Sequence, residues 1–543
     1  MDVLNFLYWL VTLVIRAFYK SGIGLVRFIR WAFRKRPTTF GSAEWAGLGK
    51  LVRAGALGNK GLIVGKAWGR LLRFNGDGAV LVAAPMGSGK GVGIVIPNLL
   101  DHPGAVICTD PKGENEARTS DYRATLGPVF RLNAIHPERS DSFNPLDMIR
   151  LKTATEFDDA LMLADLLVVP ESADSYWDTA AKNTLAAAIM YVMRTRQPAE
   201  RTLATVGALV DDAGEMLRDT FTRMAEWPEQ SIASLGRTAL QRMDNDEFLS
   251  VMSNTSKALK IWASDRIAGR LSMQSSFNLM DVHTTPMTVY VMVPEELLGV
   301  YGPYLRVIMG CTMAALVRGK GLARPKAKPL VLLDECQALG RLDALERSVG
   351  YLREYAHLML IFQDLGRMRA LYGEDGADSF VAASGAQVLF GVNDLRTARD
   401  MAEILGHKTV QTRSEGQSQA NTDLLRRQDQ AGISEAGRLL LDASEILRLP
   451  HNRAIVRMNT VRAPIKARKV RYFKENRWAG LWKDWRDGAD AAAPVDFDEP
   501  FAPHGIAQAT DASGQADTPG HPAIPSQAHQ SDRSGRPPVS GGA

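Results

Sequence analysis

The sequence is poor in the features that mark several large classes of protein. Its three cysteines, Cys108, Cys311 and Cys336, lie far apart and in apolar stretches. This spacing excludes a zinc cluster and a disulfide scaffold, and it predicts reduced core residues of a cytosolic body. No uninterrupted apolar stretch reaches the roughly 18 residues that indicate a membrane span, which argues against a polytopic membrane protein. The net charge of +5 is too small for this length to indicate a nucleic-acid partner by itself.

What the chain does have is enough length and apolar content for several cores. At roughly 150 residues per domain, 543 residues allow three or four units. With 45% hydrophobic and 23% charged residues, the composition excludes a collagen, a coiled coil and a globally disordered chain.

The N-terminus combines a short apolar stretch with a basic stripe. Residues 3–15 (VLNFLYWLVTLVI) are largely apolar, and Arg16 ends the stretch. In a helix, five basic residues fall within an arc of roughly 80°: Arg16, Lys20, Arg27, Arg30 and Arg34. This pattern predicts a helix that lies on an anionic membrane surface or crosses it as one short tilted span, with the remaining chain on the cytoplasmic side. The alternative is a helix packed on its own domain.

Further along the chain, short apolar runs bounded by turn residues alternate with helical patterns. The runs predict buried parallel strands of an α/β sheet: Val80–Ala84, Ala105–Thr109, Val289–Val293, Leu330–Leu333, Leu358–Phe362 and Val388–Phe390.

Residues 40–74 are rich in glycine, and we expect them to be irregular. Residues 157–278 lack strand patterns and carry apolar residues at helical spacing, so we expect an all-helical insertion. Residues 488–543 are rich in Ala, Pro, Gly and Ser, and we expect a disordered tail.

The most specific motif is a glycine-rich loop directly after the strand GAVLVA. Gly87 and Gly89 allow backbone N–H groups to converge on phosphate oxygens, and Lys90 supplies a charge for the β- and γ-phosphates. Ala84 replaces the first glycine of the usual P-loop pattern, and Gly91 replaces the hydroxyl residue that usually ligates magnesium. The alternative is a fortuitous glycine-rich turn. The predicted nucleotide-binding residues are Pro85, Met86, Gly87, Ser88, Gly89, Lys90, Gly91 and Val92.

A second motif places two acids at the end of the apolar run 330–333. Asp334 is expected to hold magnesium and Glu335 to polarise the attacking water, because strand ends deliver such side chains to the carboxyl edge of a parallel sheet. Gln363 ends another predicted strand and is suited to sense the γ-phosphate or to orient water. The alternative for Asp334 and Glu335 is that they cap the next helix. The alternative for Gln363 is a simple hydrogen bond at the end of its strand.

Two further charged features are expected near the same edge. Residues 108–114 (CTDPKGE) follow a predicted strand and cluster charges beside a turn. Arg353 precedes the strand that ends in Gln363, and it could reach the γ-phosphate of a neighbouring subunit as an arginine finger; a surface salt bridge is the alternative.

Taken together, these segments resemble the type IV secretion coupling ATPases of the TraG type. The resemblance rests on FGSAEWA at 40–46, APMGSGKGVGIVIPNLL at 84–100, TDPKGEN at 109–115, FNPL at 143–146, YWD at 176–178, LLDECQALG at 332–340, IFQDLGRM at 361–368, FGVND at 390–394 and LPHNRAIVRMN at 449–459. It covers about residues 40–475 in the expected order. A glycine after the P-loop lysine, as at Gly91, is common in the TraG-like branch.

The resemblance implies a RecA-like α/β motor domain, mostly parallel in its sheet, with an inserted all-α domain. We expect the motor to comprise residues 38–156 and 279–487, the all-α domain residues 157–278, the membrane-associated helix residues 1–37 and the tail residues 488–543. Family members usually carry two N-terminal membrane helices with a periplasmic loop between them, for which a leader of about 37 residues has no room.

The resemblance also implies ATP and Mg²⁺ as cofactors and a homohexamer at the cytoplasmic face of a bacterial inner membrane. The first hypothesis is a motor that recruits relaxase-bound single-stranded DNA of a relaxosome and drives it to the secretion channel. A basic lumen would contact the phosphates, and candidate positions are Arg369, Arg396 and Arg399. The alternatives are the same motor exporting protein effectors, or a recruitment platform that does not hydrolyse ATP.

Overall fold

The computed structural model describes residues 38–169, 175–211, 215–243, 247–322, 325–418 and 428–483. The predicted N-terminal helix, residues 1–37, and the predicted tail, residues 488–543, lie outside these ranges, and their structure stays a prediction.

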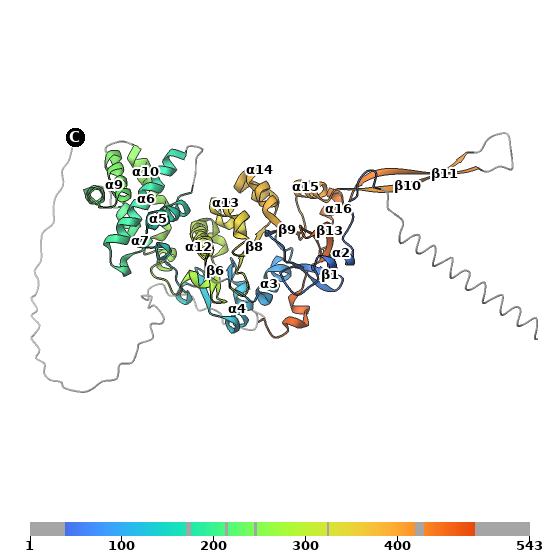
Figure 1. Cartoon of the computed structure of the whole chain (residues 1–543), viewed down its shortest axis with the longest axis horizontal. Helices are drawn as coiled ribbons and strands as arrows, with labels where there is room; N and C mark the ends of the chain where they lie inside the picture. Colours follow the sequence, from blue (N-terminus) through green and yellow to red (C-terminus); the bar gives the residue numbers. More distant parts are fainter. Residues whose placement is uncertain are drawn as a thin grey trace, which may run out of the picture. The chain divides into compact units, whose positions relative to one another are not determined.

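The centre of the fold is an eleven-stranded sheet with the order β2-β1-β13-β12-β9-β3-β8-β7-β4-β6-β5 (Figure 1). Seven neighbouring strands, from β9 to β5, run parallel, and β12, β13, β1 and β2 extend the sheet with antiparallel pairing. The strands are β1 Leu62–Ala67, β2 Arg70–Phe74, β3 Ala79–Ala83, β4 Val106–Thr109, β5 Val129–Asn133, β6 Thr288–Met292, β7 Leu330–Leu333, β8 His357–Phe362, β9 Ser384–Leu389, β12 Arg453–Met458 and β13 Val461–Arg468.

The six strands predicted from apolar runs are all present, as β3, β4, β6, β7, β8 and β9. The expectation that residues 40–74 are irregular is wrong, because this segment forms α2 (Leu48–Arg53) and the strands β1 and β2. Its glycines made it look irregular. Gly65 sits at a break in the β1–β2 register, and the backbone of Gly61 passes so close to Phe74 that a Cβ would lie 2.2 Å from the Phe74 carbonyl oxygen.

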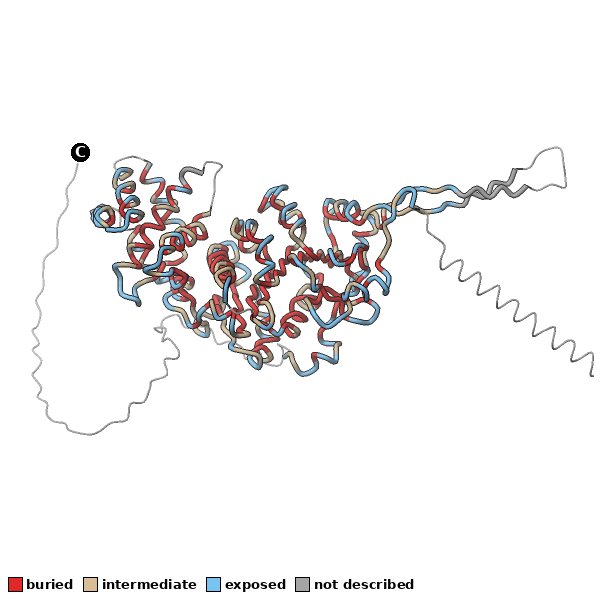
Figure 2. Tube along the Cα trace, viewed as in Figure 1, coloured by how far each residue is buried: buried red, intermediate tan, exposed pale blue. Residues whose placement is uncertain are grey.

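Apolar side chains fill both faces of the sheet. On β3, Leu81 belongs to one buried cluster, whereas Val80 and Val82 belong to the cluster on the other face. Successive strand residues point to opposite faces, so a strand covered on both sides is apolar throughout. Figure 2 shows the central strands of this sheet as buried.

Helices connect and cover the parallel strands. After β3 the chain forms a π-helical turn, Gly91–Val95, which continues as α3. The helices are α3 Ile96–Asp101, α4 Glu114–Leu126, α12 Leu298–Arg318, α13 Asp343–Leu352, α14 Leu365–Ala383, α15 Leu395–Leu405 and α16 Ala443–Leu447. Within the described residues, one helical stretch, Glu295–Arg318, is long and apolar enough to cross a membrane, but 78% of its apolar window is buried in the protein. This stretch therefore has the burial of a core helix.

Between β5 and β6 the described residues form helices and turns. These helices are α5 Glu156–Leu167, α6 Ser175–Thr195, α7 Leu203–Asp211, α8 Glu215–Ala225, α9 Gln230–Met243, α10 Glu247–Leu259 and α11 Ile267–Arg270. The helical region joins the rest of the core through α5 and α12. Arg306 of α12 donates hydrogen bonds to the carbonyl oxygens of Leu166 (2.7 Å) and Leu167 (3.3 Å) at the end of α5. A cation there satisfies carbonyl groups that a helix end leaves without partners.

A long hairpin that the sequence did not predict follows α15. Its strands are β10 (His407–Ser418) and β11 (Gln428–Leu439), and they pair in antiparallel register. Figure 1 shows the hairpin extending away from α15 and α16. At its base, Ser42 forms an isolated bridge with Lys408.

Candidate nucleotide-binding site

The glycine-rich loop lies at the carboxyl end of β3, between β8 and β9. The backbone N–H of Ala84 donates to the carbonyl oxygen of Phe362 (2.9 Å), which fixes where the loop starts. Gly87 and Gly89 have φ angles of 72° and 84°, which other residues rarely adopt. These two glycines therefore allow the tight turn of the loop, in which the backbone N–H of Ser88 donates to the carbonyl oxygen of Pro85 (3.0 Å).

The helix after the loop explains Pro97, which a continuous α-helix would not accommodate. Lys90 precedes the π-helical turn Gly91–Val95, and Pro97 then falls in the first turn of α3. A proline at that position does not remove an intrahelical hydrogen bond of α3. Gly93 is held against the ring of Phe390, because a Cβ on Gly93 would lie 2.7 Å from that ring.

Lys90 contacts both acids of the second motif. Its Nζ lies 2.8 Å from Oδ1 of Asp334 and 2.5 Å from Oε2 of Glu335. Burial alone would lower the pKa of Lys90, but the two carboxylates outweigh that effect and raise it. Burial also raises the pKa of Asp334, although Lys90 opposes this. The structure thus brings together the predicted phosphate-binding lysine and both predicted catalytic acids.

Glu335 is held in a defined orientation. Its backbone has φ 64° and ψ 54°, a left-handed conformation that is uncommon outside glycine. The side-chain amides of Gln337 and Gln363 both donate hydrogen bonds to Oε1 of Glu335, the oxygen that does not contact Lys90. The structure therefore places Gln363 in contact with Glu335. Gln337 was missed, and the only signal for it was its position two residues after Glu335.

A fourth strand end adds a buried acid beside this cluster. The side chain of Thr109, at the end of β4, donates to the backbone carbonyl oxygen of Asp334 (2.8 Å). Asp110 accepts from the side chain of Asn115 (3.1 Å) and from the backbone N–H of Glu116 (2.8 Å). Burial, together with the charge of Asp334, raises the pKa of Asp110 to about 7. Lys112 of the same segment instead pairs with Glu295 at 3.1 Å.

The polar groups at this edge match the chemistry of a nucleotide phosphate chain and Mg²⁺. The Oγ of Ser88, in the glycine-rich loop, is buried without a hydrogen-bond partner. Among the described residues, no three His, Cys, Asp or Glu side chains are grouped as a metal site. A cation here would therefore be held by Asp334 with water and phosphate oxygens, which is the coordination that Mg²⁺ usually takes with nucleotides.

The remaining predicted residues lie elsewhere. Arg353 directly follows α13. Its carbonyl oxygen accepts a hydrogen bond from Lys328 (2.8 Å), and Lys328 lies just before β7. Arg353 therefore lies near the amino ends of β7 and β8. It is exposed and outside the Lys90 cluster of its own chain. Arg369 is ion-paired with Glu374 and Asp400, Arg396 also pairs with Glu374, and Arg399 is exposed.

One contact to the loop was not predicted at all. Lys469, just after β13, donates from Nζ to the carbonyl oxygen of Ser88 (2.8 Å). The same ammonium lies 4.9 Å from the ring centre of Phe390. Burial lowers the pKa of Lys469 to about 8. No sequence motif links residue 469 to residue 88; only the antiparallel strands bring them together.

Comparison with known proteins assigns this geometry to a family. The family described as Type IV secretory system Conjugative DNA transfer matches residues 40–500. Protein VirD4 of Agrobacterium fabrum is 30% identical over 462 residues, which is 82% of this chain and 67% of that protein. Conjugal transfer protein TraG of Escherichia coli is 28% identical over 402 residues, which is 70% of this chain and 63% of that protein.

Solved structures confirm the fold class. The plasmid coupling protein TrwB, in complex with ADP and Mg²⁺, has a TM-score of 0.59 at 16% identity, covering 81% of this chain and 96% of that one. TrwB with the ATP analogue ADPNP gives a TM-score of 0.58 at 16% identity, with the same coverage. The predicted RecA-like α/β fold with an inserted all-α domain is therefore confirmed.

Proposed function

The chain belongs to the type IV secretory system conjugative DNA transfer family, and we propose that it is a coupling ATPase that drives single-stranded DNA toward a secretion channel. The observation that carries this proposal is the Lys90–Asp334–Glu335 cluster beside the glycine-rich loop. It lies where the carboxyl ends of the neighbouring parallel strands β3, β8 and β7 meet. Open α/β sheets bind their ligands at this edge.

The described side chains suit each step of ATP hydrolysis. Lys90 binds the β- and γ-phosphates, while Gly87, Ser88 and Gly89 surround the phosphate chain. Asp334 would hold Mg²⁺, which would neutralise negative charge on the phosphates, and the nucleotide would supply the γ-phosphoryl group. When Lys90 turns to the phosphates, Oε2 of Glu335 is free to accept a proton from the attacking water.

Two side-chain amides orient Glu335 for that proton transfer. Gln337 and Gln363 hold Oε1 of Glu335, so the free oxygen keeps its direction when Lys90 leaves. Gln363 lies at the end of β8, next to β3, where it can also sense the γ-phosphate. The known complexes of TrwB with ADP and Mg²⁺ and with ADPNP support ATP and Mg²⁺ as the cofactors.

We propose a homohexamer in which Arg353 acts on the neighbouring subunit's nucleotide. In this arrangement residues 38–156 and 279–487 form the motor, and residues 157–278 form the all-α domain. The basic segment within residues 1–37 would hold the motor at the cytoplasmic face of a bacterial inner membrane, next to the channel proteins. The family description, conjugative DNA transfer, and the relative TraG, a conjugal transfer protein, support DNA as the cargo. We propose that this DNA is a single strand bound to a relaxase.

Mg²⁺-dependent ATP hydrolysis by the full-length assembled protein tests this proposal. Single-stranded DNA should raise the rate of hydrolysis. Lys90→Ala should abolish hydrolysis. Glu335→Gln should slow hydrolysis by about 10²-fold or more and should retain nucleotide binding. Glu403→Gln, which neutralises an exposed acid on α15, is the matched control and should leave the rate unchanged. Absence of turnover in the unmodified assembly would leave only a recruitment platform.

A further inference from the structure

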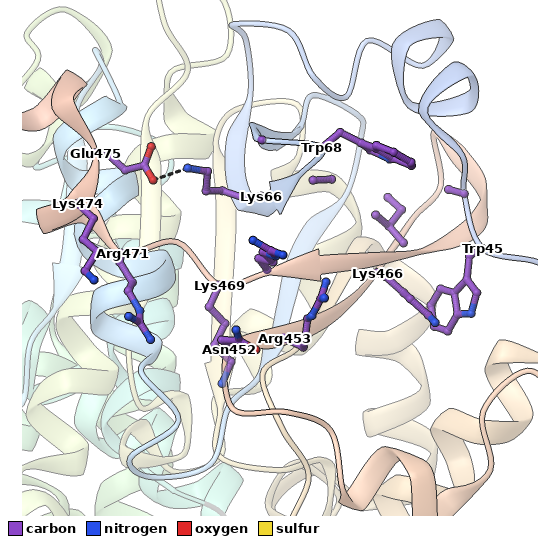
Figure 3. Close-up of a pocket in the computed structure, with 15 residues that line it drawn as sticks. Trp45, Lys66, Trp68, Asn452, Arg453, Lys466, Lys469, Arg471, Lys474 and Glu475 are labelled. Atoms are coloured by element: carbon purple, nitrogen blue, oxygen red, sulfur yellow. Dashed lines mark hydrogen bonds and ion pairs between the residues drawn. The ribbon is translucent and has the colours of Figure 1, made fainter.

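A basic cavity of about 850 Å³ lies beside the antiparallel strands, away from the Lys90 cluster (Figure 3). It is formed by the turn between β1 and β2, the start of β12, the strand β13 and the segment after β13. Six cationic side chains line it: Lys66, Arg453, Lys466, Arg468, Arg471 and Lys474. Lys469, which contacts the glycine-rich loop, is a seventh. Lys469 therefore links the lining of the cavity to that loop.

The strand register places like charges next to each other. Arg468 of β13 is directly opposite Lys66 of β1 on one side and Arg453 of β12 on the other. Residues that are paired across antiparallel strands point to the same face, and like charges in such pairs destabilise a sheet. A row of three cations across three strands thus costs folding stability unless an anion covers it.

The chain itself supplies little negative charge to the cavity. Glu475 is the one acid in the lining, and it pairs with Lys66 at 2.5 Å. Within the described ranges, no carboxylate lies within ion-pair distance of Arg453, Arg468, Arg471 or Lys474. The cavity therefore keeps at least four unneutralised cations, and its ligand should carry several negative charges.

Two tryptophans add flat apolar surfaces to this charge. Trp45 lies under the ammonium group of Lys466, 4.7 Å from the ring centre. Trp68 has 66% of its surface exposed and a φ of 52°, an unusual conformation for a bulky residue. Figure 3 shows both rings at the same side of the cavity, across from Arg471 and Lys474. An exposed indole in a strained turn is costly to keep unless the indole binds something.

We propose that this cavity binds single-stranded nucleic acid, with phosphates on the cations and an unpaired base on the exposed ring of Trp68. Single-strand binding sites combine these two features, a basic groove for the backbone and aromatic rings for unpaired bases. In a duplex the bases are stacked on each other and cannot reach Trp68, and a flat anionic membrane does not fill a concave site. The inference deepens the proposed DNA motor, and it rests on that function for the source of the strand.

Lys469 connects this site to the nucleotide loop. Its ammonium donates a hydrogen bond to the carbonyl oxygen of Ser88, while its neighbours Arg468 and Arg471 line the cavity. A phosphate group that binds the ammonium of Lys469 would weaken the hydrogen bond from Lys469 to Ser88. The conformation of the loop that binds ATP would then change. Strand binding is therefore coupled to nucleotide affinity through one hydrogen bond.

The binding test uses fluorescence anisotropy of the full-length protein with a labelled oligo-dT strand at several salt concentrations. The double variant Arg453→Gln/Arg468→Gln should weaken binding by about tenfold and reduce the slope of log K against log salt by about 1.4. Trp68→Ala should weaken binding at least about fivefold with an unchanged slope. Arg139→Gln/Lys260→Gln removes the same charge at exposed sites outside the cavity and should bind like the unmodified protein.

The outcomes of this test distinguish an error in the binding site from an error in the proposed motor function. Equal strand affinity of the unmodified protein and Arg453→Gln/Arg468→Gln would overturn the cavity as the site and leave the motor standing. No binding of the strand by the unmodified protein would also contradict DNA as cargo. If the variant instead loses binding to anionic phospholipid vesicles and keeps the strand, the ligand is a membrane and the inference is wrong.

The coupling is tested separately with Lys469→Met. In the unmodified protein, oligo-dT should change the KM for ATP hydrolysis. In Lys469→Met the strand should still bind, within about threefold of normal affinity, but should no longer change the KM. A KM that responds to the strand equally in both proteins would contradict the connection through Ser88.

Discussion

At the scale of single residues, Lys90 neutralises two carboxylates that are largely buried at the carboxyl edge of the sheet. Asp334 and Glu335 have 10% and 15% of their side-chain surface exposed, and Lys90 lies within 2.8 Å of both. In the absence of nucleotide, Lys90→Ala should therefore lower the free energy of unfolding by about 2–3 kcal/mol, because it leaves two acids without a counter-charge.

Denaturant unfolding without nucleotide measures this effect. The double variant Lys90→Ala/Glu335→Gln should recover part of the loss, since only one buried charge then remains. If Lys90→Ala unfolds at the same denaturant concentration as the unmodified protein, the ion pairs do not stabilise the empty site.

Two buried histidines predict how stability depends on pH. Burial lowers the pKa of His102 to about 3, with further effects from Arg123 and His357, and burial lowers the pKa of His357 to about 4. Their unfolded pKa is about 6.5. As pH falls from 6.5 toward 4, the unfolded chain binds protons that the folded chain does not, so stability falls by up to about 1.4 kcal/mol per pH unit for each histidine.

Thermal unfolding between pH 7 and pH 4.5 checks this sign. The midpoint should drop as the pH falls, and His357→Gln should make the drop shallower. A midpoint that rises on acidification, or a slope that His357→Gln leaves unchanged, would contradict the account.

The residues of the site were predictable only where a local pattern carries them. Glycines before a lysine, and acids at the end of an apolar run, predicted the loop around Lys90 and the pair Asp334–Glu335. Gln337 and Lys469 carry no such pattern. Each acts because tertiary structure brings it to Glu335 or to Ser88, and a single sequence does not encode that proximity in a readable form.

At the scale of elements, the packing of α12 against α5 depends on one buried cation. Arg306 is 5% exposed and holds the last carbonyl groups of α5, and burial lowers its pKa to about 10. Arg306→Met should destabilise the protein by about 2–3 kcal/mol, because it leaves buried carbonyl oxygens without donors. Arg347→Met, which removes an exposed pair with Asp165, should change stability by less than about 0.5 kcal/mol.

Hydrogen exchange locates the effect of Arg306→Met. Faster exchange should appear first in the last turn of α5. Equal stability of the Arg306→Met and Arg347→Met variants would show that this cap does not fix the helical region.

The elements themselves were predictable in proportion to how fully they are buried. Six strands of the parallel half are buried on both faces along most of their length, so they appear as apolar runs. The seventh, β5, lies at the edge and is only partly buried, and it was not predicted. Strands β1, β12 and β13 mix cations with apolar residues, and they line the basic cavity. In β2, Arg73 pairs with Asp101 instead. The hairpin β10–β11 is polar along its length and offers no apolar alternation, so its two strands were not predicted.

At the scale of the whole assembly, Arg353 and Lys90 should belong to the same active site only when two subunits meet. Lys90→Ala and Arg353→Ala should each abolish hydrolysis. Mixed together before assembly, they should recover part of it, because some sites would combine an intact Lys90 from one subunit with an intact Arg353 from its neighbour. ATP hydrolysis by the mixture, beside each variant alone, measures this; no recovery in a mixture shown to co-assemble would exclude Arg353 as a finger in trans.

Crosslinking in cells that are transferring cargo, followed by identification of what is bound to the protein, tests most directly whether the protein moves DNA. A single DNA strand should be crosslinked to the unmodified protein, and in Lys90→Ala the strand should not advance to the channel. Protein cargo recovered without DNA, under conditions in which transfer proceeds, would contradict DNA as the cargo.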